Sequence, residues 1–474
     1  MLAIRTPSPA FTILLALTLC PAAAIAGGDA AYFDVGPGQP VDISADGSTV
    51  IGAGFTWTEG GGQQTVPGMV SGGGVPALSA DGSIFTGTST DPISGLDVAT
   101  RWSPGGVVLP LGGIPVGTPS GASLSSGYDI SNDGSTVVGL AWVDAGTAAA
   151  FKWTAATGMV QMPQMGPNSS RASAISGDGS VIGGWDEANN GPRRAALWRG
   201  PSMTEELILV SPSNPDGLGE VNAISTDGAY AVGQRFDRPF RYRASDGAVQ
   251  VLSAPPGASP GQSYWALGVS DDGKTIVGGG GSFFFGGLVS WIWFEGVGTL
   301  RLADYASGLG LTVDPLLFAN ATSISPDGKR ICGWGPDPIF PDGWVLDLPV
   351  IETWQDLGGG TVGSNGAVTL EGSGPLTPGS TASLTLSNAP AGVLSLVWLS
   401  FTSVPNDFFG GTIYAMPPNR QILFVTNGAG EIPLATTWPP GLPPMSELWF
   451  QFLVQDISVI WEITLSNALK ATTP

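Results

Sequence analysis

The chain has 474 residues, among them 72 glycines, 40 prolines and 16 tryptophans, and 42% of it is hydrophobic. This much glycine and proline excludes a helical bundle, and the apolar content excludes a disordered chain, so an all-β protein with many short strands and tight turns is expected. The sequence contains no histidine, which excludes histidine-based catalytic triads and histidine metal ligands. A net charge of −21 disfavours nucleic acids and anionic membrane surfaces as partners.

The first residues are typical of a secretory signal peptide. Arg5 precedes the apolar stretch 11–19, which is too short to span a bilayer, and an A-x-A-type cleavage site follows. We therefore predict a signal peptide over residues 1–26 and an exported mature protein, secreted or in the cell envelope, without a transmembrane segment. A lipoprotein signal with Cys20 as the lipidated residue is the alternative, although Leu19 stands where a small residue is expected.

A short motif recurs seven times along the chain. It consists of an apolar residue, Ser, any residue, Asp and Gly, followed by a β-branched run. The Asp-Gly dipeptide predicts a hairpin turn, because Gly adopts positive φ without strain and Asp tolerates it. Successive copies lie 35 to 55 residues apart, about 47 on average. The seven aspartates are Asp46, Asp81, Asp133, Asp178, Asp227, Asp272 and Asp327.

Each period supplies four antiparallel strands, because an aromatic strand such as 151–153 and a further apolar strand such as 249–252 follow the hairpin. Four strands in this length match one blade of a β-propeller. We predict a seven-bladed β-propeller over residues 27–350. The seventh unit lacks a fourth strand, so the spare strand 32–35 is expected to pair with 344–348 and close the ring. An open solenoid is the alternative.

Over residues 40–348 the chain resembles the bacterial extracellular repeat family named for its His-Ala-Phe motif. Residues 149–151, Ala-Ala-Phe, stand where His-Ala-Phe would, and no copy keeps the histidine. The resemblance implies propeller-like repeats and export. It implies no activity, and any role specific to that histidine is absent here.

The last segment, residues 351–474, lacks the repeat and contains only two cationic residues, Arg420 and Lys470. Short apolar strands alternating with Pro and Gly turns predict a small β-sandwich. The segments 375–380 and 466–469 resemble a C-terminal module of secreted proteins of planctomycete-type bacteria. That resemblance implies an accessory domain.

The second turns of the predicted blades vary in length and gather on one face of the ring. Variable loops on a rigid scaffold commonly carry function, so we expect a ligand to contact this face. The acidic residues of these loops could instead be solvated or paired with nearby arginines, and Phe284 could pack against the C-terminal domain. The candidate ligand-binding residues are Asp144, Asp186, Glu187, Arg235, Asp237 and Phe284.

These observations favour an exported, non-enzymatic binding or scaffold protein whose partner is a glycan, a protein or a cell-envelope component. The alternative is a carbohydrate-active enzyme, a glycoside hydrolase or lyase, that uses two carboxylates facing each other across the central funnel.

We expect no cofactor and no metal site, because each repeated Asp stands alone with one Gly, unlike the multi-ligand loops that hold calcium. No catalytic residue is singled out by spacing. Ser259 matches G-x-S-x-G, but the proline after it and the missing histidine argue against a nucleophile. Cys332 is expected to be a small buried apolar residue.

Overall fold

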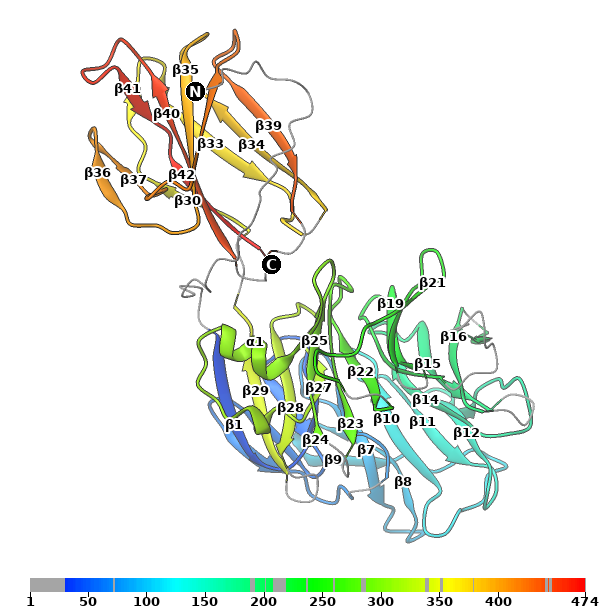
Figure 1. Ribbon diagram of the computed structural model, residues 1–474. Helices are drawn as coiled ribbons and strands as arrows, with labels where there is room; N and C mark the ends of the chain where they lie inside the picture. The colour runs from blue at the N-terminus through cyan, green and yellow to red at the C-terminus, as the bar shows by residue number, and fades with distance from the viewer. Residues whose placement is uncertain are drawn as a thin grey trace. The chain divides into compact units, whose positions relative to one another are not determined.

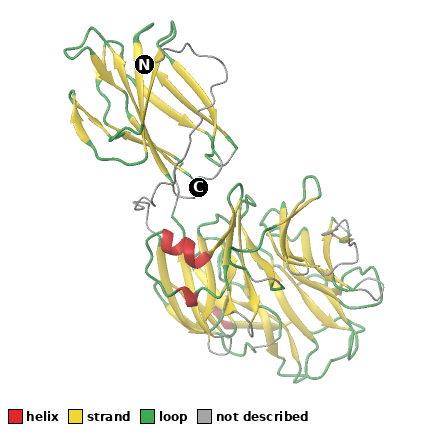
Figure 2. Ribbon diagram, viewed as in Figure 1, coloured by secondary structure: helices red, strands yellow, loops and turns green. Residues whose placement is uncertain are grey.

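The computed structural model describes residues 30–70, 73–187, 192–200, 202–207, 219–235, 238–258, 261–282, 287–336, 341–349, 353–377, 379–439, 442 and 446–473. Strands dominate these residues (Figure 2), which confirms the predicted all-β class. The described helices are short: α1 (Leu302–Gly308) and the 3-10 turns η1 (Pro104–Gly106) and η3 (Pro315–Leu317). Among the residues described, no helix is long and apolar enough to cross a membrane. The predicted signal peptide lies outside the described residues.

Contacts divide the described residues into two compact units, a first one over 30–349 and a second one over 353–473. The first unit contains five separate four-stranded antiparallel sheets, each in sequence order. Figure 1 labels some of their strands, among them β7, β11 and β15. Their strands are β2 (Pro40–Ile43), β3 (Thr49–Gly52), β4 (Phe55–Thr58), β5 (Gly62–Thr65); β6 (Ala77–Leu78), β7 (Phe85–Thr90), β8 (Asp97–Ser103), β9 (Val107–Pro110); β10 (Ser125–Ile130), β11 (Thr136–Trp142), β12 (Ala148–Thr154), β13 (Gly158–Gln161); β14 (Ser170–Ile175), β15 (Val181–Asp186), β16 (Arg194–Arg199), β17 (Thr204–Leu207); and β18 (Gly219–Ile224), β19 (Tyr230–Arg235), β20 (Arg238–Arg243), β21 (Ala248–Val251).

A nine-stranded sheet completes the first unit. It joins two further groups through a single residue pair, Gly279 with Asn320. One group is β22 (Ser263–Val269), β23 (Thr275–Ser282), β24 (Gly287–Leu288), β25 (Trp291–Phe294) and β26 (Gly298–Arg301); the other is β27 (Asn320–Ile324), β28 (Arg330–Pro336), β29 (Pro341–Asp347) and β1 (Ala31–Pro37). The antiparallel pairing of β1 with β29 places Tyr32 opposite Leu346. The predicted pairing of the spare N-terminal strand with the last repeat is therefore confirmed.

The first strand of each group contacts the first strand of the next group. These contacts run from β2 through β6, β10, β14, β18 and β22 to β27, and β27 in turn contacts β2. The third strands supply large side chains to the space between successive sheets, where Phe151, Trp198, Phe240, Trp291 and Trp344 are fully buried. The first unit is thus β-propeller-like, with sheets arranged around an axis that the first strands line.

All seven Asp-Gly turns share one set of hydrogen bonds. The motif Ser hydroxyl donates to the motif Asp at 2.6–2.8 Å, and the glycine that follows has φ between +67° and +74°. In the third copy, Asp133 Oδ1 also accepts the N–H of Ser135 at 2.9 Å, and Ser131 Oγ accepts the N–H of Thr136 at 3.0 Å. Because all seven serines are buried, the Ser and Asp side chains together satisfy the polar groups of a tight turn.

The second unit contains two larger antiparallel sheets and two small hairpins. The six-stranded sheet is β30 (Trp354–Gly358), β42 (Ala468–Thr472), β40 (Glu447–Gln455), β35 (Leu394–Ser400), β38 (Arg420–Val425) and β41 (Ile463–Leu465); the three-stranded sheet is β33 (Thr369–Ser373), β34 (Thr381–Ser387) and β39 (Ile432–Thr437); the hairpins are β31 (Val362–Gly363) with β32 (Gly366–Ala367) and β36 (Asn406–Phe408) with β37 (Gly411–Ile413). One hydrophobic core draws side chains from both sheets, such as Leu386 on β34 and Phe452 on β40.

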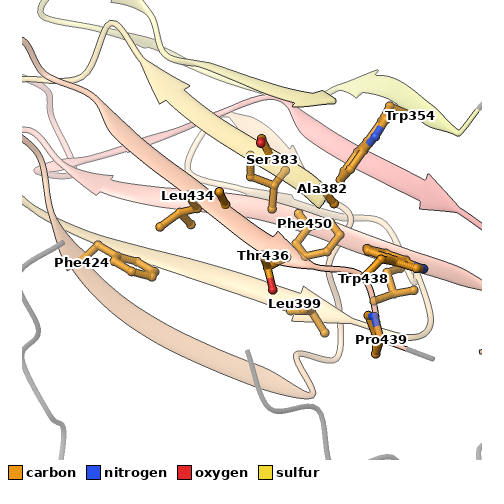
Figure 3. A pocket seen from close by; sticks show the side chains of 13 residues that line it. Trp354, Ala382, Ser383, Leu399, Phe424, Leu434, Thr436, Trp438, Pro439 and Phe450 are labelled. Carbon is orange, nitrogen blue, oxygen red and sulfur yellow. The ribbon is translucent and has the colours of Figure 1, made fainter. Parts of the chain in front are cut away.

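A small apolar cavity of about 40 Å³ lies within this core (Figure 3). Trp354, Leu434, Trp438 and Phe450 are among the side chains that line it. A space of this size holds about one water molecule, and its apolar walls offer that water almost no hydrogen-bond partner. We therefore interpret the cavity as a packing defect of the core and not as a ligand pocket.

Candidate functional site

A cavity of about 610 Å³ lies among the first strands of the propeller-like unit, and all seven groups contribute to its wall. We call it the central cavity. A concave site in which a few polar groups from different elements converge is the usual form of a ligand-binding site. The polar and charged residues that line it include Asp42, Tyr128, Asp129, Arg171, Ser173, Glu220, Asn222, Asp271 and Asn320.

One end of the central cavity is formed by the variable third residue of each Asp-Gly motif. A Cβ atom placed on Gly177 would approach Asn132 Nδ2 at 2.5 Å and Thr226 Cγ2 at 2.7 Å, so neighbouring motif residues nearly touch at this end. All seven of these residues line the cavity: Ala45, Ala80, Asn132, Gly177, Thr226, Asp271 and Pro326.

The same seven residues link neighbouring sheets through backbone hydrogen bonds. In five steps the N–H of one residue donates to the carbonyl of its counterpart in the next sheet, at 2.8–2.9 Å. At the step from Thr226 to Asp271, the Thr226 N–H donates instead to the side chain of Asp271 at 2.8 Å. At the seventh step Pro326 has no N–H to donate. The five backbone pairs are Ala45–Ala80, Ala80–Asn132, Asn132–Gly177, Gly177–Thr226 and Asp271–Pro326.

Asp42 and Asp129 lie in the wall of the cavity at equivalent positions, directly before the apolar residue of the motif. Asp129 accepts the N–H groups of Ile130 and Ile175, both at 2.7 Å. Asp42 accepts hydrogen bonds from the N–H of Leu78 at 2.9 Å and from the hydroxyl of Ser323 on β27 at 3.0 Å. Burial raises the pKa of Asp129 to about 8, with the charge of Asp42 adding to the effect, and burial raises the pKa of Asp42 to about 6.

Towards the other end of the cavity, Arg171 on β14 forms an ion pair with Glu220 on β18. The Arg171 guanidinium also lies over the ring of Tyr128, 4.7 Å from its centroid, and 5.6 Å from that of Trp185. Burial lowers the pKa of Arg171. The guanidinium of Arg193 also stacks on Trp185, 4.1 Å from the centroid of its ring. Alternating cations and rings therefore connect the cavity wall to the second turn between β15 and β16.

The residues that sequence reasoning singled out have different surroundings. Glu187 forms an ion pair with Arg193 at 3.5 Å, and so belongs to the row of charges and rings just described. Asp186 is buried at the end of β15, opposite Arg194. Arg235 ends β19, opposite Arg238 in the register.

Asp144 accepts the N–H groups of Gly146 and Thr147, both at 2.8 Å, and thereby forms its own exposed turn. These hydrogen bonds lower the pKa of the Asp144 carboxyl. Asp237 and Phe284 lie outside the described residues. None of the four described candidates is in the wall of the central cavity.

Most of the polar cavity residues lie on strands, whereas the described candidates predicted from the sequence lie in or beside the second turns. One signal was available in the repeat itself. At the position before the apolar motif residue, two copies have Asp, Asp42 and Asp129, whereas the other five have Ala, Gly or Ser. Two acids at a position otherwise occupied by small residues indicate a contact specific to these two repeats.

Comparisons with known proteins assign no family. No protein-family model and no curated protein matches the sequence. Among solved structures, a protein named TolB from Agrobacterium tumefaciens matches at 16% identity and a TM-score of 0.40, over 66% of this chain and 99% of that one. TolB from Acinetobacter baumannii matches at 12% identity and a TM-score of 0.35, over 66% of this chain and 63% of that one. Hydrazine synthase from Kuenenia stuttgartiensis matches at 13% identity and a TM-score of 0.38, over 63% and 92%. Similarities at this level assign no activity or ligand.

Proposed function

We propose that the chain is a non-enzymatic binding protein, exported to the cell envelope or the extracellular space, whose first unit is a seven-bladed propeller and whose second unit is an accessory β-sandwich. The ligand is a small polar molecule or the end of a polar chain, a glycan above all, seated in the central cavity. The observation that carries this proposal is the convergence of polar side chains from separate strands on one cavity of about 610 Å³.

One feature supports entry from the face of the second turns. Arg171, the buried Trp185 and Arg193 stack in a row that leads from the cavity wall to this face, and the Arg193 side chain at the end of the row is about half exposed. Acidic side chains outnumber Arg171 in the cavity wall, so a neutral or cationic ligand is favoured over an anionic one.

The binding role is favoured over catalysis because both oxygens of Asp129, and both of Asp42, accept hydrogen bonds within the fold. A carboxylate anchored in this way holds strands together. One observation nevertheless favours a second candidate, acid-catalysed glycoside cleavage. The pKa values of the two carboxyls are raised to about 8 and about 6, the range that a general acid requires near neutral pH.

The test is a screen of the purified protein against soluble neutral, amino and acidic oligosaccharides, scoring both retention and cleavage. Ala223 lines the cavity, so Ala223→Trp should reduce retention at least tenfold. Ala248→Trp, on the exposed face of β21, is the matched control and should bind normally. Circular dichroism checks that both variants fold. Retention that Ala223→Trp leaves unchanged would exclude the cavity as the site.

Cleavage products in the same screen would support glycoside cleavage as the function, provided that Asp129→Asn abolishes these products and Ala248→Trp does not. Retention without cleavage supports the binding role.

A further inference from the structure

A group of large apolar side chains is exposed on the second unit. Ile457 is 77% exposed, Ile460 91% and Trp461 60%, and all three belong to the turn between β40 and β41. Phe409, at the tip of the β36–β37 hairpin, is also exposed, and its ring centroid lies 5.6 Å from that of Trp461. We call these four residues, with Phe408, the aromatic patch.

The aromatic patch is held in place by the fold. Asp456, itself buried, accepts the N–H of Ser364 at 2.6 Å and that of Ser458 at 3.1 Å, and its own N–H donates to the carbonyl of Glu462 at 2.9 Å. The turn that presents Trp461 is therefore closed on itself and fastened to the β31–β32 hairpin. A surface whose side chains are already positioned loses little conformational entropy when a partner binds.

The rings of the patch continue into the sheet. Phe408 contacts Phe409 at a centroid distance of 4.3 Å, and Trp398 on β35 supports Phe408 at 6.1 Å. Exposed aromatic residues in a contiguous group, with packed rings behind them, are typical of protein interaction sites. A single solvent-exposed Ile or Trp would need no such explanation.

The charges around the patch are negative. Asp407 precedes Phe408 and Glu462 follows Trp461, and both acids are exposed. Residues 351–474 contain eight acids and two cations. Of these cations, Lys470 pairs with Glu447 at 3.1 Å, and Arg420 donates to the carbonyl of the preceding residue. The patch therefore attracts cations, which the aromatic faces also accept, and it repels anionic lipids and acidic glycans.

We propose that the aromatic patch is a docking surface for a basic polypeptide segment in which Lys or Arg alternates with apolar residues. The apolar side chains of such a segment cover Ile457, Ile460 and Trp461, and its cations face Asp407 and Glu462. A neutral glycan supplies no charge for the two carboxylates and little aliphatic surface for the isoleucines. This partner differs from the ligand of the central cavity, and the two sites are tested separately.

The experiment titrates the full-length exported protein with a labelled ten-residue peptide of alternating Lys and Leu, followed by fluorescence anisotropy. We expect the Lys-Leu peptide to bind, and to bind more weakly as salt is added. Two control peptides, one of alternating Glu and Leu and one of alternating Lys and Ser, should each bind at least fivefold more weakly. Ile460→Ala and Trp461→Ala should each weaken binding of the Lys-Leu peptide at least fivefold, as should Asp407→Asn combined with Glu462→Gln.

Val362→Ala is the matched control, because Val362 is an equally exposed apolar residue of the same unit, outside the patch. Ile460 contributes little to the core, so its variant keeps the test valid if Trp461→Ala fails to fold. Peptide binding that the patch variants leave unchanged would overturn the proposal. So would stronger patch-dependent binding to phosphatidylcholine vesicles or to cellohexaose, or a dimer that only the patch variants dissociate, since each result identifies a different occupant.

Discussion

Single side chains account for most of the regularity of the first unit. The seven Ser-Asp pairs bond each hairpin in the same way, and both residues are visible in the sequence motif. The Asp-Gly hairpins were therefore predicted correctly from the sequence, because local turn chemistry decides them. The buried role of the serine was not anticipated, since it depends on an acceptor and a donor brought together by the folded turn.

At this scale Asp129 provides a test of pH dependence. Its pKa is raised to about 8, from an ordinary value near 4 in the unfolded chain, so the folded protein holds a proton that the unfolded chain releases. The stability of the native protein should fall as the pH rises from about 4 to about 8. Asp129→Asn carries no proton to lose, so its stability relative to the native protein should rise over this interval, by at most about 5 kcal/mol for a pKa shift from about 4 to about 8.

Urea denaturation at several pH values measures this difference. Asp144→Asn is the control: the pKa of Asp144 is lowered, so its contribution to stability is constant above pH 4 and is lost only below that value. A relative stability of Asp129→Asn that does not change with pH would contradict the assignment of a raised pKa.

At the scale of elements, the order of the strands was easier to predict than which residues of each first strand face the cavity. The missing fourth strand of the last repeat and the spare strand before the first followed from counting. The inward-facing residues did not follow, because the register of six of the seven first strands shifts just before the apolar motif residue, for example between Gly127 and Asp129. A bulge breaks the alternation of faces on which such predictions depend. The acids of the cavity therefore could not be placed from the pattern.

The outer strand β9 provides a prediction about an edge. It is the last strand of its sheet, and Val107, Val108 and Leu109 are all exposed. An apolar edge of this kind pairs readily with another chain. Val108→Lys should reduce self-association at high protein concentration, measured by sedimentation velocity, with Val362→Lys as the control. Equal association of the native protein and Val108→Lys would show that the edge is not used.

At the scale of the whole molecule, the first unit depends on the strand β1, which belongs to the last sheet although it comes first in the chain. Val35 on β1 is buried with Ile43, Val50 and Val345, in the same core as Cys332, which is buried as expected. The core of the first repeat is thus completed only when the two ends of the unit meet.

Val35→Asp places an unpaired carboxylate in this core and should lower the free energy of unfolding by about 3–5 kcal/mol. Thermal denaturation followed by circular dichroism measures the change. Val107→Asp, at an exposed position, is the control and should cost little. A melting temperature of Val35→Asp equal to that of the native protein would show that the unit does not require β1.

The proline at the seventh step has a mechanical consequence. Six of the seven joints between neighbouring turns have a hydrogen bond from a backbone N–H. At the joint after Pro326 only side chains donate among the described residues: Thr322 to the carbonyl of Pro40 at 2.8 Å, Ser323 to Asp42 at 3.0 Å and Arg330 to the carbonyl of Gly47 at 3.0 Å. The chain enters the unit at β1 and leaves it after β29, and these two strands pair with each other in the sheet beside this joint. A pull on both ends of the unit would therefore load the β1–β29 ladder first, and that ladder should open before the joints between neighbouring turns.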